Sequence, residues 1–124
     1  MRENTLKRRL KDGKPAFGTG ITFNSGEAVE FLGLVGYDFI FIDGEHAGIG
    51  PERCYDLVRA ANAVGVEAVV RAPSSDPGVI LPYLETGAST IIVPHCYNAE
   101  IVRLAVSAGK HPPRGVRGVG SGSR

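Results

Sequence analysis

Short apolar runs alternate with amphipathic segments along this 124-residue chain. The alternation repeats every ~25 residues, and glycine or proline marks most segment ends. The predicted strands span residues 16–23, 39–42, 68–71 and 90–93, and the predicted helices span 4–11, 27–35, 51–64, 77–86 and 99–108. We expect Pro82 to kink the fourth helix or to delay its start. This order of elements predicts a parallel sheet with right-handed crossover connections.

Two α/β architectures fit this alternation, a (β/α)8 TIM-barrel type and a small doubly wound sheet. The first predicted strand is not followed by a GxGxxG turn, which would favour a dinucleotide-binding doubly wound sheet. Polar side chains recur instead where the next three strands end, as they do in barrel enzymes. We therefore predict the barrel type, with residues 1–124 forming an N-terminal helix and the first four βα units. These units would be the N-terminal half of a single barrel domain.

Half of a barrel leaves two strand edges and an apolar inner face uncovered. Exposed edges and apolar faces promote association. We therefore expect the chain to be a fragment of a longer barrel, or to pair with something that covers this face.

The composition argues against several classes of protein. A net charge of +1 lacks the basic excess expected of a nucleic-acid or membrane-surface protein. No apolar segment approaches the roughly 18 residues needed to span a bilayer. Residues 1–14 carry charges but no apolar region follows them, so we expect no secretory signal. Two cysteines do not make a disulfide framework, and we expect a cytoplasmic, reduced protein.

Chemically versatile side chains follow three successive predicted strands. They are Asp43, Glu45 and His46 after the second strand, Arg71 after the third, and His95 after the fourth. The carboxyl ends of barrel strands share one rim, so we expect these side chains to lie together. Imidazole titrates near neutral pH, guanidinium offers a planar fork for a carboxylate or an enolate, and carboxylates hold metals or their waters. The set suggests proton abstraction next to a carbonyl of an acidic substrate.

Each candidate also has an ordinary structural interpretation. A histidine at a strand end is often a surface or hydrogen-bonded residue, and Arg71 can simply pair with Asp43 or Glu45 across adjacent strands. No role is predicted for Cys54, expected on a helix, or for Cys96, expected to be a small buried hydrophobe. Solvated loop or chain-end positions are expected for His111, Arg114, Arg117 and Arg124.

Four motifs, in this order, resemble those of the HpcH/HpaI aldolase family. They are IDGEHA at 42–47, VVRAP at 69–73, LETGAS leading into IIVPH at 84–95, and PPRGVRGVGS at 112–121. This family comprises metal-dependent (class II) pyruvate aldolases, including 4-hydroxy-2-oxoheptanedioate and 2-keto-3-deoxyglucarate aldolases. The resemblance covers essentially the whole chain, but only the first half of a family member.

The resemblance implies a (β/α)8 barrel that assembles into homo-oligomers, commonly hexamers. It implies reversible aldol cleavage of a small 4-hydroxy-2-oxo acid to pyruvate and an aldehyde. A divalent ion, Mg²⁺, Mn²⁺ or Co²⁺, would polarise the 2-oxo group and stabilise the enolate. His46 matches the family's base, acting through water, and Arg71 matches the residue that steadies the enolate and the carboxylate. Glu85 stands where the family usually has an aspartate that raises the basicity of that histidine.

The family's metal ligands, a glutamate and an aspartate, would lie on later strands beyond Arg124. Asp43 and Glu45 would then at most order the waters of the metal, and His95 would support the site or contact the substrate. Glu85 lies at a helix end and so, by topology, on the opposite rim from His46. If Glu85 contacts a catalytic base, we expect that base to belong to a neighbouring subunit.

Three interpretations follow from these residues. The first is a class II pyruvate aldolase. In this interpretation the 124-residue chain alone neither holds the divalent ion nor catalyses the aldol cleavage. The second is a non-catalytic half-barrel that self-associates or docks on a partner. The third is a related barrel lyase of the citrate-lyase β type, which acts on acyl-CoA thioesters.

Overall fold

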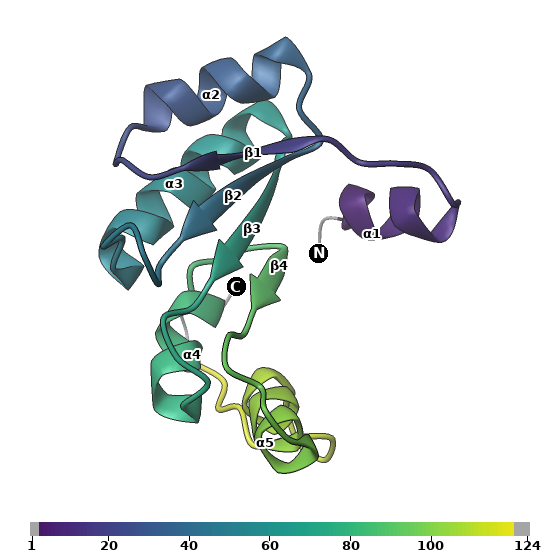
Figure 1. Cartoon of the computed structure of the whole chain (residues 1–124), viewed down its shortest axis with the longest axis vertical. Coiled ribbons are helices and arrows are strands. Elements are labelled where there is room, and N and C mark those ends of the chain that lie inside the picture. The colour runs from purple at the N-terminus through teal and green to yellow at the C-terminus, as the bar shows by residue number, and fades with distance from the viewer. Residues whose placement is uncertain (1–2, 121–124) are drawn as a thin grey trace.

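The computed structural model describes residues 3–120, in which helices and strands alternate after an N-terminal helix (Figure 1). The elements in chain order are α1 (Thr5–Lys11), β1 (Gly18–Ile21), α2 (Gly26–Val35), β2 (Phe39–Asp43), α3 (Pro51–Val64), β3 (Glu67–Arg71), α4 (Pro77–Leu84), β4 (Thr90–Ile92) and α5 (Ala99–Gly109). Every predicted helix and strand is therefore present within this range, with ends that differ by a few residues.

The four strands form one parallel sheet in the order β1-β2-β3-β4. Each strand pairs with the strand that follows it in the chain, as in a barrel. A doubly wound sheet would instead reverse its direction of growth at a switch point. The described residues thus have the topology of half a (β/α)8 barrel, and the barrel type is confirmed over the small doubly wound sheet. The outer edges of β1 and β4 carry no partner strand in residues 3–120.

The core lies between the sheet and the helices α2 and α3, which cover one side of it (Figure 1). Ile40 and Ile42 of β2 are completely buried, and so is Val70 of β3. These residues alternate with side chains that point to the other face of the sheet. The helices contribute fully buried residues to the same cluster, namely Val29, Leu57, Val58 and Ala61. Burying each large aliphatic side chain contributes about 1.5–3 kcal/mol, so this layer anchors the sheet.

Side-chain caps define where four of the helices begin in the described range. The side chains of Asn4, Ser25, Asp76 and Asn98 accept hydrogen bonds from backbone N–H groups of α1, α2, α4 and α5. Such caps satisfy donors that a helix leaves unpaired at its N-terminus. Helix α3 begins instead with Pro51 in its first turn and ends at Gly65 in a left-handed conformation.

Helix α1 lies apart from the other helices, at the amino ends of the strands (Figure 1). The Asn4 side chain donates to the Ser89 carbonyl at 2.9 Å, just before β4. The Thr5 backbone N–H and hydroxyl both donate to the Glu67 carboxylate, at 2.8 and 2.6 Å. Glu67 is 1% exposed at the start of β3, so its burial depends on these donors. Helix α1 therefore covers the rim opposite the candidate site.

Two predicted boundaries need correction. Strand β1 is shorter than expected because Phe17 and Phe23, which flank it, are 66% and 59% exposed and lie outside the sheet. The late start foreseen at Pro82 is wrong, because α4 begins at Pro77 and contains Pro82. The Asp76 cap and a proline at the first helical position nucleate the helix before the second proline is reached. Helix α4 ends two residues later, at Leu84.

Gly18 of β1 makes room for an aromatic ring of β2. It pairs in register with Phe39, and a Cβ at Gly18 would overlap the Phe39 ring. The ring can therefore lean over β1 on the face of the sheet away from α2 and α3. This explains a glycine at this position of a strand, where glycine usually weakens pairing. Gly20 pairs in the same way with Phe41, but a Cβ there would make only an ordinary contact with the ring.

None of the helices in residues 3–120 is long and apolar enough to cross a membrane.

A substitution at Gly44 tests how tightly the turn after β2 packs. A Cβ there would lie 2.6 Å from the Arg71 carbonyl oxygen and 2.9 Å from the Tyr83 ring. Because a backbone carbonyl in a sheet cannot move aside, Gly44→Ala should lower the free energy of unfolding by about 1–3 kcal/mol. Urea denaturation followed by circular dichroism measures it. Gly118→Ala, with open space around the new methyl group, is the control and should change stability by less than about 0.5 kcal/mol. Equal effects in the two variants would contradict the packing argument.

Candidate active site

The turn after β2 is folded by the carboxylate that ends the strand. Asp43 Oδ1 accepts hydrogen bonds from the backbone N–H groups of Glu45, at 2.9 Å, and of His46, at 3.2 Å. This is the local bonding by which aspartate stabilises tight turns. The Gly44 N–H donates to the Arg71 carbonyl at 2.9 Å and ties the turn to β3. The sequence Asp-Gly-Glu-His thus places both of its functional side chains at the carboxyl end of the sheet.

Arg71 forms a two-point ion pair with Asp43. Its Nε donates to Asp43 Oδ1 at 2.9 Å, and its Nη2 donates to Oδ2 at 2.6 Å. The two residues face each other because β2 and β3 pair in that register. The guanidinium carbon also lies 5.5 Å from the centre of the Phe41 ring. These contacts use the Nε hydrogen and one of the two Nη2 hydrogens, and no residue in 3–120 hydrogen-bonds to Nη1.

This ion pair shifts the pKa values of both Asp43 and Arg71. Asp43 is 7% exposed. The hydrogen bond from Arg71 lowers the pKa of the Asp43 carboxyl to about 2, against the opposing effect of burial. The backbone donors of the turn act in the same direction as the guanidinium. The hydrogen bond to Asp43 in turn raises the pKa of Arg71. Asp43 is therefore a permanent anion at neutral pH, with both of its oxygens engaged.

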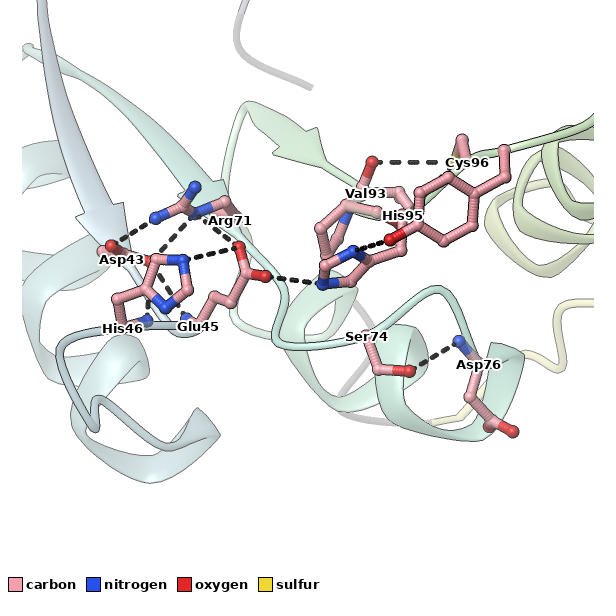
Figure 2. A network of polar contacts seen from close by, with 11 residues as sticks. Asp43, Glu45, His46, Arg71, Ser74, Asp76, Val93, His95 and Cys96 are labelled. Carbon is pink, nitrogen blue, oxygen red and sulfur yellow. Dashed lines mark hydrogen bonds and ion pairs between the residues drawn. The ribbon is translucent and has the colours of Figure 1, made fainter.

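Glu45 connects the cation of β3 to two imidazoles (Figure 2). Its side chain is 10% exposed, and its Oε2 lies 3.1 Å from Arg71 Nε and 3.6 Å from His46 Nε2. Its Oε1 lies 2.7 Å from His95 Nε2. His46 itself is far more open, with 70% of its side chain exposed. Glu45 is thus the anion shared by the cluster, whereas His46 faces solvent at its edge.

His95 has an unusual backbone for a residue other than glycine. Its φ angle is +58°, in the left-handed region, which costs about 1–3 kcal/mol for a side chain of this kind. Its Nδ1 lies 2.7 Å from the Tyr97 hydroxyl, and its ring faces the Tyr97 ring at a tilt. Sequence reasoning missed Tyr97. The only available signal was a His-x-Tyr pattern directly after a strand.

Five sequence-predicted residues therefore lie together at the carboxyl ends of β2, β3 and β4. They are Asp43, Glu45, His46, Arg71 and His95. The expected convergence of the His46 imidazole and the Arg71 guanidinium agrees with this geometry, because both contact the same Glu45 oxygen. The ordinary interpretation of Arg71, pairing with carboxylates of the adjacent strand, also describes these contacts. The chemical roles of the five residues stay predictions.

Glu85 is not part of this cluster. It follows the last residue of α4, and its Oε1 accepts from Arg117 Nε at 3.0 Å and Nη2 at 2.7 Å. A role for Glu85 toward a base of another subunit stays a prediction.

The residues that were given no role match their expected surroundings only in part. The Arg117 side chain is only 10% exposed, so a solvated end is wrong for this arginine. Cys96 is exposed rather than buried, because the segment after β4 runs along the surface. Cys54 is buried on α3 as a helix residue, and burial raises the pKa of its thiol to about 11. His111 Nδ1 lies 3.1 Å from the Arg117 carbonyl oxygen. Arg124 lies outside the described residues.

The carboxylates of the cluster do not by themselves fit a metal ion. Asp43 directs both oxygens at Arg71, and Glu45 directs one oxygen at Arg71 and the other at His95. Across residues 3–120, no group of three or more His, Cys, Asp or Glu side chains is arranged to hold an ion.

A parallel half-barrel with acids, imidazoles and a guanidinium at the carboxyl ends of its strands has the architecture of α/β-barrel enzymes. The family model of HpcH/HpaI aldolase/citrate lyase matches residues 21–123, and the chain belongs to this family. It is 40% identical over 118 residues to a 4-hydroxy-2-oxo-heptane-1,7-dioate aldolase of Klebsiella pneumoniae, covering 95% of this chain and 44% of that protein.

Solved structures give the same result. An HpcH/HpaI aldolase/citrate lyase family protein from Burkholderia cenocepacia superposes with a TM-score of 0.87 and 34% identity, over 95% of this chain and 49% of the other. The citrate synthase SbnG superposes with a TM-score of 0.86 and 33% identity, over 94% of this chain and 48% of the other. The chain thus spans about half the length of the relatives it matches.

The Asp43–Arg71 pair makes the stability of the fold depend on pH. Because the folded-state pKa of Asp43 lies below its usual 3.8, the pair stabilises the fold above about pH 4. This contribution is lost as the pH falls toward 2, and at this partly open rim it amounts to about 1–2 kcal/mol. Asp43→Asn should lower stability at pH 7 and flatten its dependence on pH between 4 and 2, measured by urea denaturation. Asp12→Asn, whose carboxylate lies 3.9 Å from Lys14 on the surface, should keep the parent slope. An unchanged slope in Asp43→Asn would show that the pair is not the acid-sensitive contact.

Proposed function

We propose that residues 1–124 are the N-terminal half of a single barrel domain that catalyses reversible aldol cleavage of a 4-hydroxy-2-oxo acid. The products are pyruvate and an aldehyde. The observation that carries the proposal is the meeting of the His46 imidazole and the Arg71 guanidinium at one carboxylate, Glu45. A base and a planar anion-binding group within one small site suit proton transfer beside a carboxylate and a carbonyl. Membership of the HpcH/HpaI family and the aldolase names of the relatives support it.

Arg71 is the group that binds the acid in this proposal. Asp43 holds Nε and Nη2, so the planar guanidinium is locked in one orientation and directs Nη1 away from the pair. A substrate carboxylate can accept from Nη1 without displacing Asp43. An arginine that was not held in this way would lose conformational entropy on binding.

His46 is the base in this proposal, acting directly or through one water. It removes the proton of the 4-hydroxyl group, and the new C=O bond of the aldehyde forms as the C3–C4 bond breaks. The electron pair of that bond moves to C3 and is delocalised into the 2-oxo group as an enolate. The proton taken up by His46 then returns, directly or through the same water, to C3 and gives pyruvate. The side chain of His46 is 70% exposed, which leaves room for a substrate beside the imidazole.

The complete enzyme needs more than these residues. We propose that a divalent ion is held by a glutamate and an aspartate outside residues 1–124 and stabilises the enolate when bound. We also propose that the enzyme is a homo-oligomer, in which Glu85 lies near a neighbouring copy. The pairing of Glu85 with Arg117 leaves the glutamate one-third exposed, which is compatible with a contact to another chain.

A carbon–carbon lyase acting on acyl-CoA thioesters is the second candidate. The name of the family includes citrate lyase, and the structurally similar SbnG is a citrate synthase. These reactions also pass through an enolate beside a carboxylate, so the same Arg71 and His46 serve them. A substrate panel of 4-hydroxy-2-oxo acids and hydroxyacyl-CoA thioesters separates the two candidates. A non-catalytic half-barrel that docks on a partner would turn over none of these substrates, whether tested as the 124-residue chain or within a longer polypeptide.

The isolated 124-residue chain tests the assignment of the metal ligands. Because its described residues do not form a metal site, it should show no pyruvate release from a 4-hydroxy-2-oxo acid with added Mn²⁺. Release is measured by coupling to lactate dehydrogenase, and circular dichroism establishes that the chain is folded. A longer polypeptide that carries both halves of the barrel is the positive control. Substantial turnover by the folded short chain would refute the proposal that the ligands lie outside it.

Substitution of His46 tests the base within the active polypeptide that contains these residues. His46→Ala should lower kcat by about 10²–10⁴-fold, because a positioned base contributes that much to a proton transfer. His111→Ala is the matched control, since His111 lies in the C-terminal segment beside a backbone carbonyl, and its kcat should be unchanged. Retention of most activity in a folded His46→Ala enzyme would remove His46 from the proton transfer.

A further inference from the structure

Two residues after β4 extend the polar cluster in a direction that the proposed reaction does not explain. His95 Nε2 lies 2.7 Å from Glu45 Oε1 (Figure 2). His95 Nδ1 lies 2.7 Å from the Tyr97 hydroxyl. The three side chains form a continuous line of polar contacts, a hydrogen bond between Tyr97 and His95 and an ion-pair contact between His95 and Glu45, from the loop after β4 to the turn after β2. Glu45 continues this line to Arg71, at 3.1 Å.

The backbone is arranged to present the imidazole to Glu45. His95 adopts a φ angle of +58°, in the left-handed region that residues other than glycine rarely occupy. The Tyr97 N–H donates back to the His95 carbonyl at 3.0 Å, which closes a tight local turn. The turn brings the two side chains onto the same side, with ring centres 5.7 Å apart. A residue other than glycine keeps a left-handed backbone only where the surrounding structure holds it there. Such residues are concentrated at functional sites.

Tyr97 makes no contribution to the core that would explain its presence. It is 81% exposed, so little of its ring is removed from water. Its hydroxyl instead lies 2.7 Å from His95 Nδ1. If the hydroxyl donates to Nδ1, the hydrogen of the neutral ring must sit on Nε2, the nitrogen that lies 2.7 Å from Glu45 Oε1. A donating tyrosine would thus select the tautomer that carries its hydrogen on the Glu45 side of the ring.

We propose that Tyr97 and His95 are a pair of positioning residues that hold the Glu45 carboxylate away from the free end of Arg71. Glu45 has two oxygens, and His95 engages Oε1 while Oε2 serves Arg71 Nε. Released from His95, the carboxylate is free to rotate and accept from Nη1, whose N–H groups are available to a substrate carboxylate. The pair therefore keeps the anion-binding end of Arg71 open. This consequence rests on the proposed function, because it assumes an acidic substrate at Arg71.

The first measurement is the tautomer of His95, read from long-range ¹H–¹⁵N correlation spectra of the imidazole rings at about pH 8, where free imidazole is neutral. The His95 signals are those lost in His95→Gln. The parent protein should show the Nε2–H tautomer, and Tyr97→Phe should move the His95 nitrogen shifts toward a mixture of tautomers. Tyr37→Phe removes the hydroxyl of a tyrosine outside the site and is the matched control. Identical His95 shifts in the parent and in Tyr97→Phe would overturn the pair.

The second measurement is steady-state kinetics of the same variants in the active enzyme. Tyr97→Phe should raise the KM for the 2-oxo acid by about five- to tenfold, the effect of losing one net hydrogen bond, with kcat within about twofold. His95→Gln keeps an N–H donor within reach of Glu45 and should preserve KM. His95→Asn tolerates the left-handed backbone but is too short to reach Glu45, so its KM should rise like that of Tyr97→Phe.

These outcomes separate this inference from the proposed function. If KM is unchanged in both Tyr97→Phe and His95→Asn while His46→Ala is inactive, the positioning pair is wrong and the aldolase assignment stands. If His46→Ala remains active, the aldolase assignment fails. The tautomer measurement alone then tests whether Tyr97 and His95 act as a positioning pair. Equal increases of KM in His95→Gln and His95→Asn would show that the backbone, and not the donor, is responsible, and would overturn the proposal.

Discussion

The ion pair between Asp43 and Arg71 is the contact on which the candidate site depends. It joins the last residues of two neighbouring strands, which the parallel register sets opposite each other. Asp43 also folds the turn that carries Glu45 and His46, through their backbone N–H groups. Arg71 in turn holds Glu45, and Glu45 holds His95. Each further side chain is therefore oriented by a partner that traces back to this one pair.

A charged pair is stable here because it lies at the rim of the sheet and not in its middle. Deeper in the same strands, Ile40, Ile42 and Val70 are fully buried against the helices. Placing carboxylates in that layer would cost several kcal/mol per ion. At the carboxyl ends of the strands, water and the opposing charge reduce this cost. The separation of an apolar layer that holds the sheet from a polar rim that carries chemistry is common to barrel enzymes.

The inner face of the half-barrel shows how the first strand accommodates the second. Phe39 pairs in register with Gly18 of β1, which leaves space for its ring, and Phe41 pairs with Gly20. The Phe41 ring also lies beneath the Arg71 guanidinium. An aromatic surface on this face thus supports the cation from below while Asp43 orients it from the side. The same face and the outer edges of β1 and β4 are where the rest of a barrel would pack, in keeping with relatives of twice the length.

Much of the fold could be predicted because its signals are local. Helix α3 was predicted with both of its ends, since Pro51 begins it and Gly65 ends it. The four strands were located from apolar runs, although β1 is shorter because Phe17 and Phe23 are apolar by type but exposed by position. The start of helix α4 at the Asp76 cap and Pro77 was also predicted, and only the alternative of a late start at Pro82 was wrong.

The amino-acid sequence by itself determined the alternation of strands and helices and the rim on which the acids, imidazoles and guanidinium collect. Periodicity, caps and chain direction suffice for that. Only the tertiary structure decided which of them touch. The strand register paired Asp43 with Arg71, the left-handed backbone of His95 brought in Tyr97, and the surface course of the segment after β4 exposed Cys96. These contacts join residues from different strands and loops, and their energies depend on distances of a few ångströms that no local pattern encodes.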